Sequence, residues 1–339
     1  MKKILLLVLV IVVFGVALVS WMFLGSATRF KEPKKNLYIS STAATKQAVL
    51  DSLKKNHIIK NSAVFGWLAD RMKYWQKIKP GKYEISKGSS PMKIIRMLRN
   101  GQQAPVDLVI TKLRTKADLS RLVGNKLETD SAEMMAYLNN TDSLKAFNKV
   151  PEQALTIVLP DTYRFFWNTA PQNVYKKLAD ESKKFWTFER TQKAIELGLT
   201  PEQVYILASI VDEETNASSE KGTIASVYLN RINKKMPLQA DPTIRFALND
   251  FTIKRIYGDH LNTPSPYNTY RNTGLPPGPI CTPSRKTIDA VLNRPVTDYL
   301  YFVADSSFNG THVFSANYRE HMQKARAYQQ AFKRRFAAN

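Results

Sequence analysis

Residues 200–215 read TPEQVYILASIVDEET, and this stretch carries the clearest helix signal in the chain. Thr200 is a favourable N-cap residue, Pro201 suits the first helical position, and Gln203 completes a capping box. Placed at about 100° per residue, the apolar side chains fall on one face of the helix. That face consists of Val204, Leu207, Ala208 and Val211, widened by Ile206 and Ile210.

Glu214 projects into this apolar arc, whereas Asp212 lies at its edge and Glu213 points away. Glu214 also stands at the helix C-terminus, where the helix dipole disfavours a negative charge. Partial burial and the dipole both raise the pKa of a carboxyl group. A carboxyl that stays protonated near neutral pH is suited to acid catalysis on a glycosidic bond. The alternative is that the helix ends by Asp212 and that all three acids are solvated.

The segments after this helix predict a packed helix and then rigid loops. Residues 219–235 have helical apolar spacing that favours packing against the first helix. Three stretches rich in Pro, Asn, Thr and Tyr follow, at 238–243, 262–270 and 274–280. Prolines restrict the unfolded chain, so such loops hold amides, hydroxyls and tyrosine rings in place, as carbohydrate binding requires. An ordinary rigid surface loop is the alternative interpretation.

The chain is predicted to close with a hairpin and a basic helix. Strands are expected at 299–304 and 311–315, joined by a turn at Asn309-Gly310 that favours a tight hairpin. The basic amphipathic stretch 318–336 is expected to pack on this sheet.

The N-terminal residues predict a membrane anchor. Residues 4–25 are almost continuously apolar, and about 22 helical residues span roughly 33 Å, enough to cross a bilayer. Lys2 and Lys3 precede them, so the tail 1–3 is expected in the cytoplasm and the remainder outside the plasma membrane, as a single-pass protein. A cleaved signal peptide is the alternative, because Gly25-Ser26-Ala27 is rich in small residues. The apolar run exceeds a usual signal core of about 7–15 residues, which favours the anchor.

The remaining sequence divides into three predicted regions, which makes the expected fold class α+β. After a polar linker, residues 36–111 are expected to form a small binding or spacer module. Helices are predicted at 45–54, 63–74 and 89–98, and strands at 82–86 and 106–111. Residues 112–199 are predicted to be mainly helical, interrupted at 155–166, and residues 200–339 form the expected catalytic region.

Composition limits the classes of partner and cofactor. The chain has 339 residues and a formal net charge of +22, from 50 basic and 28 acidic side chains. Such a surplus favours anionic partners, or else a generally basic solvated surface. The sequence has no nucleic-acid recognition motif, so no nucleic-acid partner is expected. Cys281 is the single cysteine, which excludes an intramolecular disulfide, and the four histidines lack metal-ligand spacing. We therefore expect neither a metal nor an organic cofactor.

Six ordered motifs lie within residues 208–305. They are Ala208-Ser209-Ile210-Val211-x-x-Glu214-Thr215, residues 224–231 (IASVYLNR), Leu238-Gln239-x-Asp241-Pro242-Thr243, residues 263–270 (TPSPYNTY), residues 274–280 (GLPPGPI) and residues 299–305 (YLYFVAD). Together they resemble the YceG-like (MltG) family of endolytic murein transglycosylases. Upstream, Pro160-Asp161-Thr162-Tyr163-x-Phe165 also fits. The turn at Lys79-Pro80-Gly81 and the strand after it resemble a LysM-like module.

The chain departs from the family pattern in three places. Asp212-Glu213 replaces the common Glu-Lys pair before the essential acid. Thr156-Ile157 stands where the family often has Glu-Gly. Thr111-Lys112-Leu113 replaces a Pro-Glu-Gly turn.

The resemblance implies endolytic cleavage of the β-1,4 bond between N-acetylmuramic acid and N-acetylglucosamine in peptidoglycan, leaving 1,6-anhydromuramyl ends. It assigns the essential acid to Glu214, acting in turn as acid and base. The residues then expected to position substrate are Gln239, Asp241, Tyr267, Asn268 and Tyr270, although Asp241 serves equally well as a structural cap. Glu220 is expected to cap or orient, and Thr215 to support the site.

Peptidoglycan strands, and peptidoglycan synthases beside them, are the implied partners. Two other functions remain open at this point. A membrane-anchored, non-catalytic glycan-binding scaffold would keep the loops and the module without needing Glu214. A DNA-binding or lipid-binding protein would depend on charge alone.

Overall fold

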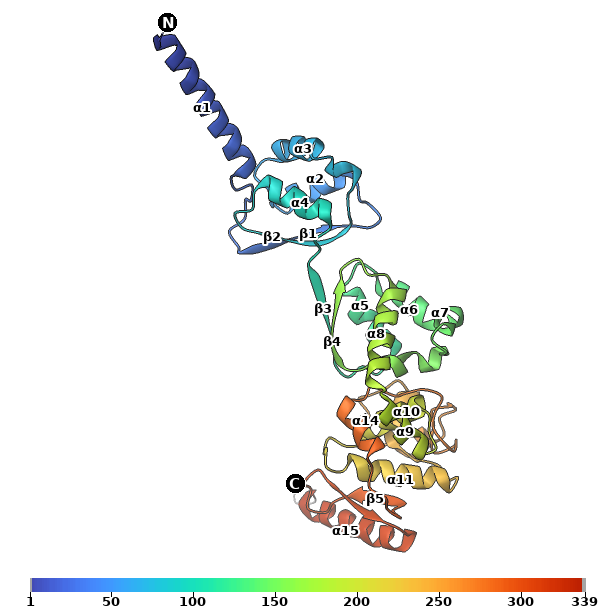
Figure 1. The fold of residues 1–339 in the computed structure, drawn as a ribbon. Helices are drawn as coiled ribbons and strands as arrows, with labels where there is room; N and C mark the ends of the chain where they lie inside the picture. Colours follow the sequence, from blue (N-terminus) through green and yellow to red (C-terminus); the bar gives the residue numbers. More distant parts are fainter. Residues whose placement is uncertain (1, 337–339) are drawn as a thin grey trace. The chain divides into compact units, whose positions relative to one another are not determined.

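The computed structural model describes residues 2–336, and for residues 2, 18–22 and 336 it describes the backbone only. The chain forms two compact units (Figure 1). The first contains the residues up to Leu108 together with 124–129 and 164–170, and the second contains 109–123, 130–163 and the chain from Pro171 onward. The mixed helix and strand content confirms the predicted α+β class.

The first unit surrounds a two-stranded antiparallel sheet with short helices. Strands β1 (Lys34–Ile39) and β2 (Gly81–Ser86) pair with Leu37 opposite Tyr83. Thr45, Asn61 and Ser90 cap the helices by accepting backbone N–H groups, which explains why each helix starts where it does. The helices are α1 (Lys2–Leu24), α2 (Lys46–Lys55), α3 (Ser62–Arg71) and α4 (Pro91–Asn100), with a 3-10 turn at Tyr74–Gln76.

The strand pairing differs from the strand–helix–strand unit predicted between 82–86 and 106–111. The partner of β2 is β1, whereas β3 (Pro105–Ile110) pairs with β4 (Asp161–Phe166). Strand β1 begins at Lys34, within the stretch whose charged residues predicted a polar linker. It forms a strand because Leu37 and Ile39 alternate inward. The linker itself is bonded into the unit, since Ala27 N donates to Ser89 O and Lys60 N donates to Ala27 O.

Helix α1 occupies the position predicted for the anchor. Its apolar side chains from Ile4 to Val16 are exposed. Among residues with described side chains, no single helix is both long and apolar enough to cross a membrane by itself. The predicted anchor at 4–25 includes residues 18–22, whose side chains lie outside the described set.

The second unit is mainly helical. Its first part contains α5 (Lys116–Gly124), α6 (Ser131–Asn139), α7 (Thr141–Lys145), a 3-10 helix at Pro151–Ile157, α8 (Pro171–Phe185) and α9 (Phe188–Glu196). Its second part contains α10 (Pro201–Glu214), α11 (Lys221–Asn233), α12 (Asp241–Ala247), α13 (Gly258–Leu261) and α14 (Arg285–Leu292). Helices α12 and α14 lie in segments for which the sequence predicted only loops or no element.

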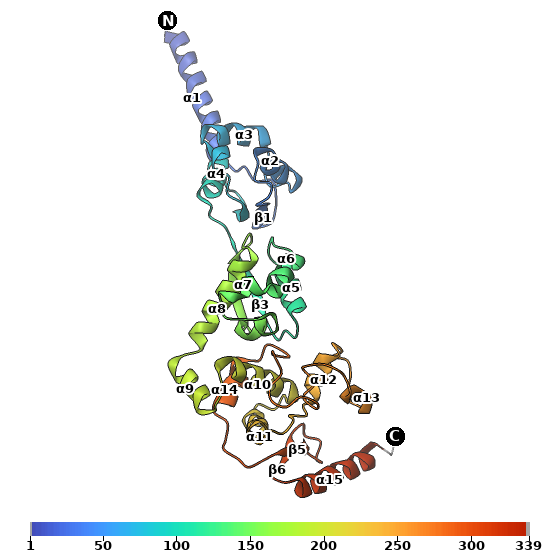
Figure 2. The same ribbon diagram turned by 90° about the vertical axis from the view of Figure 1, so that its right-hand side faces the viewer.

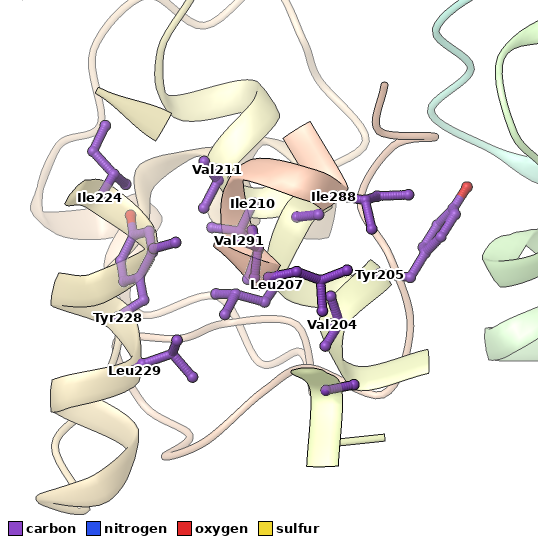
Figure 3. Close-up of a cluster of buried hydrophobic side chains, with 14 of the residues drawn as sticks. Val204, Tyr205, Leu207, Ile210, Val211, Ile224, Tyr228, Leu229, Ile288 and Val291 are labelled. Carbon is purple, nitrogen blue, oxygen red and sulfur yellow. The ribbon is translucent and has the colours of Figure 1, made fainter. Parts of the chain in front are cut away.

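Helix α10 is the central element of this unit. The predicted capping box is present, with Thr200 Oγ1 accepting from Gln203 N and Gln203 Oε1 accepting from Thr200 N. Its side chains are buried continuously from Val204 to Asp212, rather than along one stripe, because α11 and α14 pack around it. Figure 3 shows this cluster, in which Leu207 and Ile210 lie among side chains of α11 and α14.

The C-terminal hairpin and helix agree with the sequence prediction. Strands β5 (Tyr301–Ala304) and β6 (His312–Ser315) pair antiparallel, with Tyr301 opposite Ser315. Helix α15 (Tyr318–Phe336) packs on these strands (Figure 2). The Tyr301 ring stacks on the His321 ring, with centroids 5.2 Å apart.

Candidate active site

Asp212, the first of three consecutive acids on the last turn of α10, is a buried structural ion. Its carboxylate forms salt bridges with Lys221 (2.5 Å) and Lys112 (3.1 Å) and accepts a hydrogen bond from the Thr287 hydroxyl. Burial alone would raise the pKa of Asp212, but these hydrogen bonds and charges outweigh it and hold the pKa below its usual value. Asp212 therefore ties α10 to α11 and α14 as a permanent anion.

Glu213 is also paired with cations. Its carboxylate lies 3.1 Å from Lys112 Nζ and 3.1 Å from Arg114 Nη2. Both cations belong to the segment between β3 and α5, so Glu213 faces this segment. Its carboxylate is therefore occupied by two ion pairs.

Glu214 has a different environment. It is half-buried, and its Oε2 accepts a hydrogen bond from the Tyr228 hydroxyl at 3.2 Å. Among the described side chains, no salt bridge joins it. Burial, followed by the negative charge of Asp241, raises the pKa of Glu214 from 4.5 to about 7, while the Tyr228 hydrogen bond and the charge of Arg245 oppose the shift. The elevation that helix geometry predicted for Glu214 is present, and α10 continues through this residue.

Tyr228, on α11, connects Glu214 to the C-terminal hairpin. Its ring is buried and packs edge-on against Phe302 of β5, with centroids 5.9 Å apart. Phe302 in turn contacts the His312 ring at 5.3 Å. Glu220 Oε1 accepts from the His312 backbone N–H at 2.6 Å, and its other oxygen lies 3.1 Å from Nδ1. Glu220 thus orients the hairpin and makes no side-chain cap on α11.

A second acid, Asp241, approaches Glu214 from α12. It occupies the first turn of that helix, and its Oδ1 accepts a 2.5 Å hydrogen bond from the Tyr270 hydroxyl. Arg245, one turn further along α12, supplies a positive charge near Glu214. Its Nε atom is buried and has no hydrogen-bond partner among the described residues. The charges of Asp241 and Arg245 therefore shift the proton affinity of Glu214 in opposite directions.

Asn268 lies in the interior of the loop 262–270. It is fully buried, and its amide nitrogen donates to Leu261 O and Thr263 O at 2.9 Å each. Its Oδ1 accepts from Tyr270 N at 3.0 Å. These contacts use both amide N–H groups and the oxygen, so Asn268 shapes the loop that presents Tyr270, and its full burial leaves no exposed atom for a substrate.

Gln239 is the exposed member of the predicted binding set. It adopts a left-handed backbone conformation with φ of 54°, and its Oε1 accepts from Arg231 Nη1 at 3.2 Å. The buried guanidinium of Arg231 also binds the carbonyls of Leu238 and Leu300. Arg231 therefore fixes both the Gln239 turn and the start of the hairpin.

The last two predicted residues have packing roles. Tyr267 lies against Phe246, with ring centroids 4.7 Å apart, and burial raises its pKa to about 12. Thr215 is buried and ends α10, where its hydroxyl accepts a hydrogen bond from Ala217 N at 3.0 Å.

The structure thus brings together Glu214, Asp241 and Tyr270 of the predicted set. Tyr228 and Arg245 complete the site, and the sequence analysis missed their roles. Tyr228 did carry a signal, because a phenol on the inward face of an amphipathic helix needs a partner for its hydroxyl. Arg245 carried none, since the sequence did not predict α12.

Chemically, the arrangement presents one carboxyl group with a pKa near neutrality, partly exposed, beside a hydroxyl that stabilises its ionised form. Such a group can give up a proton to a leaving oxygen and then accept one from a nucleophile. Asp212 and Glu213, the two acids that precede Glu214 on α10, are ion-paired and unsuited to a second catalytic role. The site therefore fits chemistry that needs a single carboxyl group.

Comparison with known proteins gives consistent matches along most of the chain. A model of the YceG-like family matches residues 37–327. The endolytic murein transglycosylase of Bacillus subtilis (strain 168) is 29% identical over 310 residues, covering 86% of this chain and 84% of that protein. The corresponding enzyme of Streptococcus pneumoniae (serotype 2 strain D39) is 28% identical, covering 81% of this chain but 55% of that protein. A crystal structure of a YceG-like protein from Listeria monocytogenes is 25% identical with a TM-score of 0.55, covering 86% of this chain and 99% of that one.

Proposed function

Because this chain belongs to the YceG-like family, we propose that it is a lytic transglycosylase of peptidoglycan with Glu214 as its single acid and base. The observation that carries the proposal is the pKa of Glu214, raised to about 7 while Asp212 and Glu213 are bound by cations. The transglycosylase relatives, which match over most of this chain, support the assignment of the reaction class.

In the first step, protonated Glu214 donates its proton to the oxygen between N-acetylmuramic acid and N-acetylglucosamine. The bond from that oxygen to the muramyl C1 breaks, and the glucosaminyl end leaves as an alcohol. Tyr228 donates a hydrogen bond to Glu214 Oε2 and so stabilises the carboxylate that remains. Asp241 favours the protonated starting state, because its charge opposes ionisation of Glu214.

In the second step, the Glu214 carboxylate removes the proton from the muramyl 6-hydroxyl as O6 attacks C1. The product carries a 1,6-anhydro ring, and Glu214 is protonated again. Water is not consumed, so a second carboxylate to activate it is unnecessary, unlike in glycoside hydrolysis.

The proposal includes the place of action. Residues 4–25 would anchor the chain in the plasma membrane with the N-terminus in the cytoplasm, so that the second unit meets nascent strands outside. The exposed apolar side chains of α1 and the lysines before them support this orientation. Cleavage there would end strand elongation beside peptidoglycan synthases, with residues 36–111 acting as a LysM-like module.

The test is to digest purified glycan strands with the wild-type chain, Glu214→Gln and Glu213→Gln. The wild type and Glu213→Gln are expected to yield anhydromuramyl ends, identified by mass spectrometry. Glu214→Gln is expected to lose at least about 100-fold in rate, within the range for a lost general acid or base.

Equal activity of Glu214→Gln would overturn the assignment, and reducing ends in place of anhydro ends would indicate a hydrolase. Binding of strands without cleavage by the wild type would favour the glycan-binding scaffold.

A further inference from the structure

The positive charge of this protein is concentrated next to α1. Residues 26–104 carry 17 lysines and arginines but only four acids, which is more than half of the whole net charge of +22 in less than a quarter of the chain. Two of those acids are already paired, Glu84 with Lys34 and Asp70 with Lys46. The first unit therefore presents a strong surplus of cations to any anionic surface near α1.

Helix α1 ends directly on this unit. Phe23 stacks on Trp67 of α3, with ring centroids 5.7 Å apart. The backbone immediately after the helix is bonded to the unit through Ala27 and Arg29, which pairs with Ile58. Figure 1 shows α1 leaving the unit from the side that carries α3 and α4. Wherever α1 enters a membrane, this part of the unit is held at the level of the lipid headgroups.

A cavity of about 480 Å³ lies at this junction. It is bordered by Leu24 at the end of α1, by the end of β2, and by α4, which contributes Met92 and Met97 together with Lys93 and Arg96. Lys93 and Arg96 are exposed, and neither forms an ion pair with any described residue. The volume falls in the range of small-molecule sites, which is about 300–1,000 Å³.

We propose that this cavity binds the headgroup of an anionic phospholipid from the membrane that α1 enters. Lys93 and Arg96 would hold the phosphate, since ammonium and guanidinium groups are the usual donors to phosphate oxygens. Leu24, Met92 and Met97 would contact the upper part of the acyl chains, which continue along the exposed apolar surface of α1. This inference rests on the proposed membrane anchoring and is independent of the proposed chemistry at Glu214.

The test titrates the detergent-purified full chain with short-chain phosphatidylglycerol and phosphatidylcholine and follows binding by native mass spectrometry. Phosphatidylglycerol is expected to bind more tightly. The double variant Lys93→Gln/Arg96→Gln is expected to weaken its binding about 10-fold or more, because each basic residue near a lipid surface contributes on the order of 1 kcal/mol, or about 5-fold.

The matched control is Lys54→Gln/Lys55→Gln, which removes the same charge from exposed positions of α2 outside the cavity. It is expected to bind as the wild type does, and circular dichroism checks that both double variants fold. Equal weakening in the two variants would show a general charge effect and overturn the site. Equal binding of soluble glycerol phosphate, or tighter binding of glycan fragments than of phosphatidylglycerol, would overturn the lipid assignment.

Two further measurements separate this proposal from the others. Flotation of the full chain with neutral vesicles measures membrane binding through α1 alone, because these vesicles contain no anionic lipid. Glu214→Gln is expected to bind phosphatidylglycerol as the wild type does, so that failure of the catalytic assignment and failure of the lipid site give different results.

Discussion

Asp212, Glu213 and Glu214 follow one another along the chain, yet their partners divide them into two ion-paired carboxylates and one carboxyl group with a raised pKa. Cations from other segments hold the first two. Glu214 instead meets a phenol, a second carboxylate and the low-polarity core of the unit. Its ionisation is therefore controlled by residues that neighbour it only in the folded protein, which makes its pH behaviour the sharpest test of the site.

The pH dependence of activity should report the charge of Asp241. The proposed mechanism requires protonated Glu214, so kcat/KM is expected to fall as the pH rises through about 7. Asp241→Asn removes a charge that raises this pKa, so the alkaline limb should move down by about 0.5–1 pH unit. The measurement is a pH–rate profile on soluble glycan strands. Asp259→Asn makes an equal charge change at an exposed position and should leave the alkaline limb of the profile in place. An unchanged alkaline limb in Asp241→Asn would refute the effect of the Asp241 charge on the pKa of Glu214.

The raised pKa of Glu214 also has a cost in stability. Because the folded pKa of about 7 exceeds the ordinary 4.5, the folded state binds the proton more tightly, and this favourable contribution is lost as the pH rises through about 7. Glu214→Gln should therefore be more stable than the wild type at pH 8 by about 2–3 kcal/mol, with little difference at pH 4. Urea unfolding at the two pH values measures this difference. A gain in unfolding free energy of equal size at both pH values would exclude ionisation of Glu214 as its cause.

At the scale of elements, α10 is held in place by segments that arrive from far along the chain. Ser209, in the middle of the helix, accepts a hydrogen bond from Ile280 N at 3.1 Å. That contact docks the loop 274–280 onto α10. The same loop passes the 3-10 helix at residues 151–157 so closely that a Cβ on Gly278 would lie 2.0 Å from the carbonyl oxygen of Glu152.

Gly278→Ala should consequently destabilise the second unit. The added methyl meets backbone, which cannot rotate away, and also the Tyr267 hydroxyl at 2.8 Å. Overpacking of this kind costs about 1–3 kcal/mol, measured as a loss of unfolding free energy. Gly258→Ala is the matched control, because nothing lies within 4 Å of its Cβ position. Equal unfolding free energies of Gly278→Ala and Gly258→Ala would contradict the close approach of Gly278 to the Glu152 carbonyl oxygen.

The sequence predicted the positions of helices and strands better than it predicted which segments they pack against or pair with. Capping residues and apolar spacing located α4, α10, α11 and the C-terminal hairpin, because such signals act within a few residues. Strand β1 was missed because its lysines resemble a linker, and the pairing of β2 with β1 is set by contacts between segments that are distant in sequence. The candidate site followed the same pattern, since helical periodicity predicted the raised pKa of Glu214, whereas the burial of Asn268 depended on loop contacts.

At the scale of the whole molecule, each unit has its own hydrophobic core. Leu37 is buried in the core of the first unit, and Leu207 in that of the second. Every described contact of Glu214 comes from the second unit. Glu214 with its described contacts and helix α1 thus belong to different units of the chain.

The two units should unfold separately. Leu37→Ala should lower one calorimetric transition and Leu207→Ala the other, each by about 2–5 kcal/mol of unfolding free energy. Leu37→Ala should also retain cleavage of soluble strands at temperatures below its transition. A single transition shifted equally by both variants would show instead that the units unfold together.

The sequence by itself determined that a capped helix ends in three acids, that Glu214 lies on its apolar side, and that rigid loops follow. These properties come from helix periodicity, capping and proline, which are local. Only the tertiary structure decided that Asp212 and Glu213 are paired with cations while the pKa of Glu214 is raised to about 7. That outcome depends on Lys221, Tyr228 and Asp241, which the fold alone brings to the end of α10. A carboxyl pKa is set by burial and by charges in space, and neither is specified by adjacent residues.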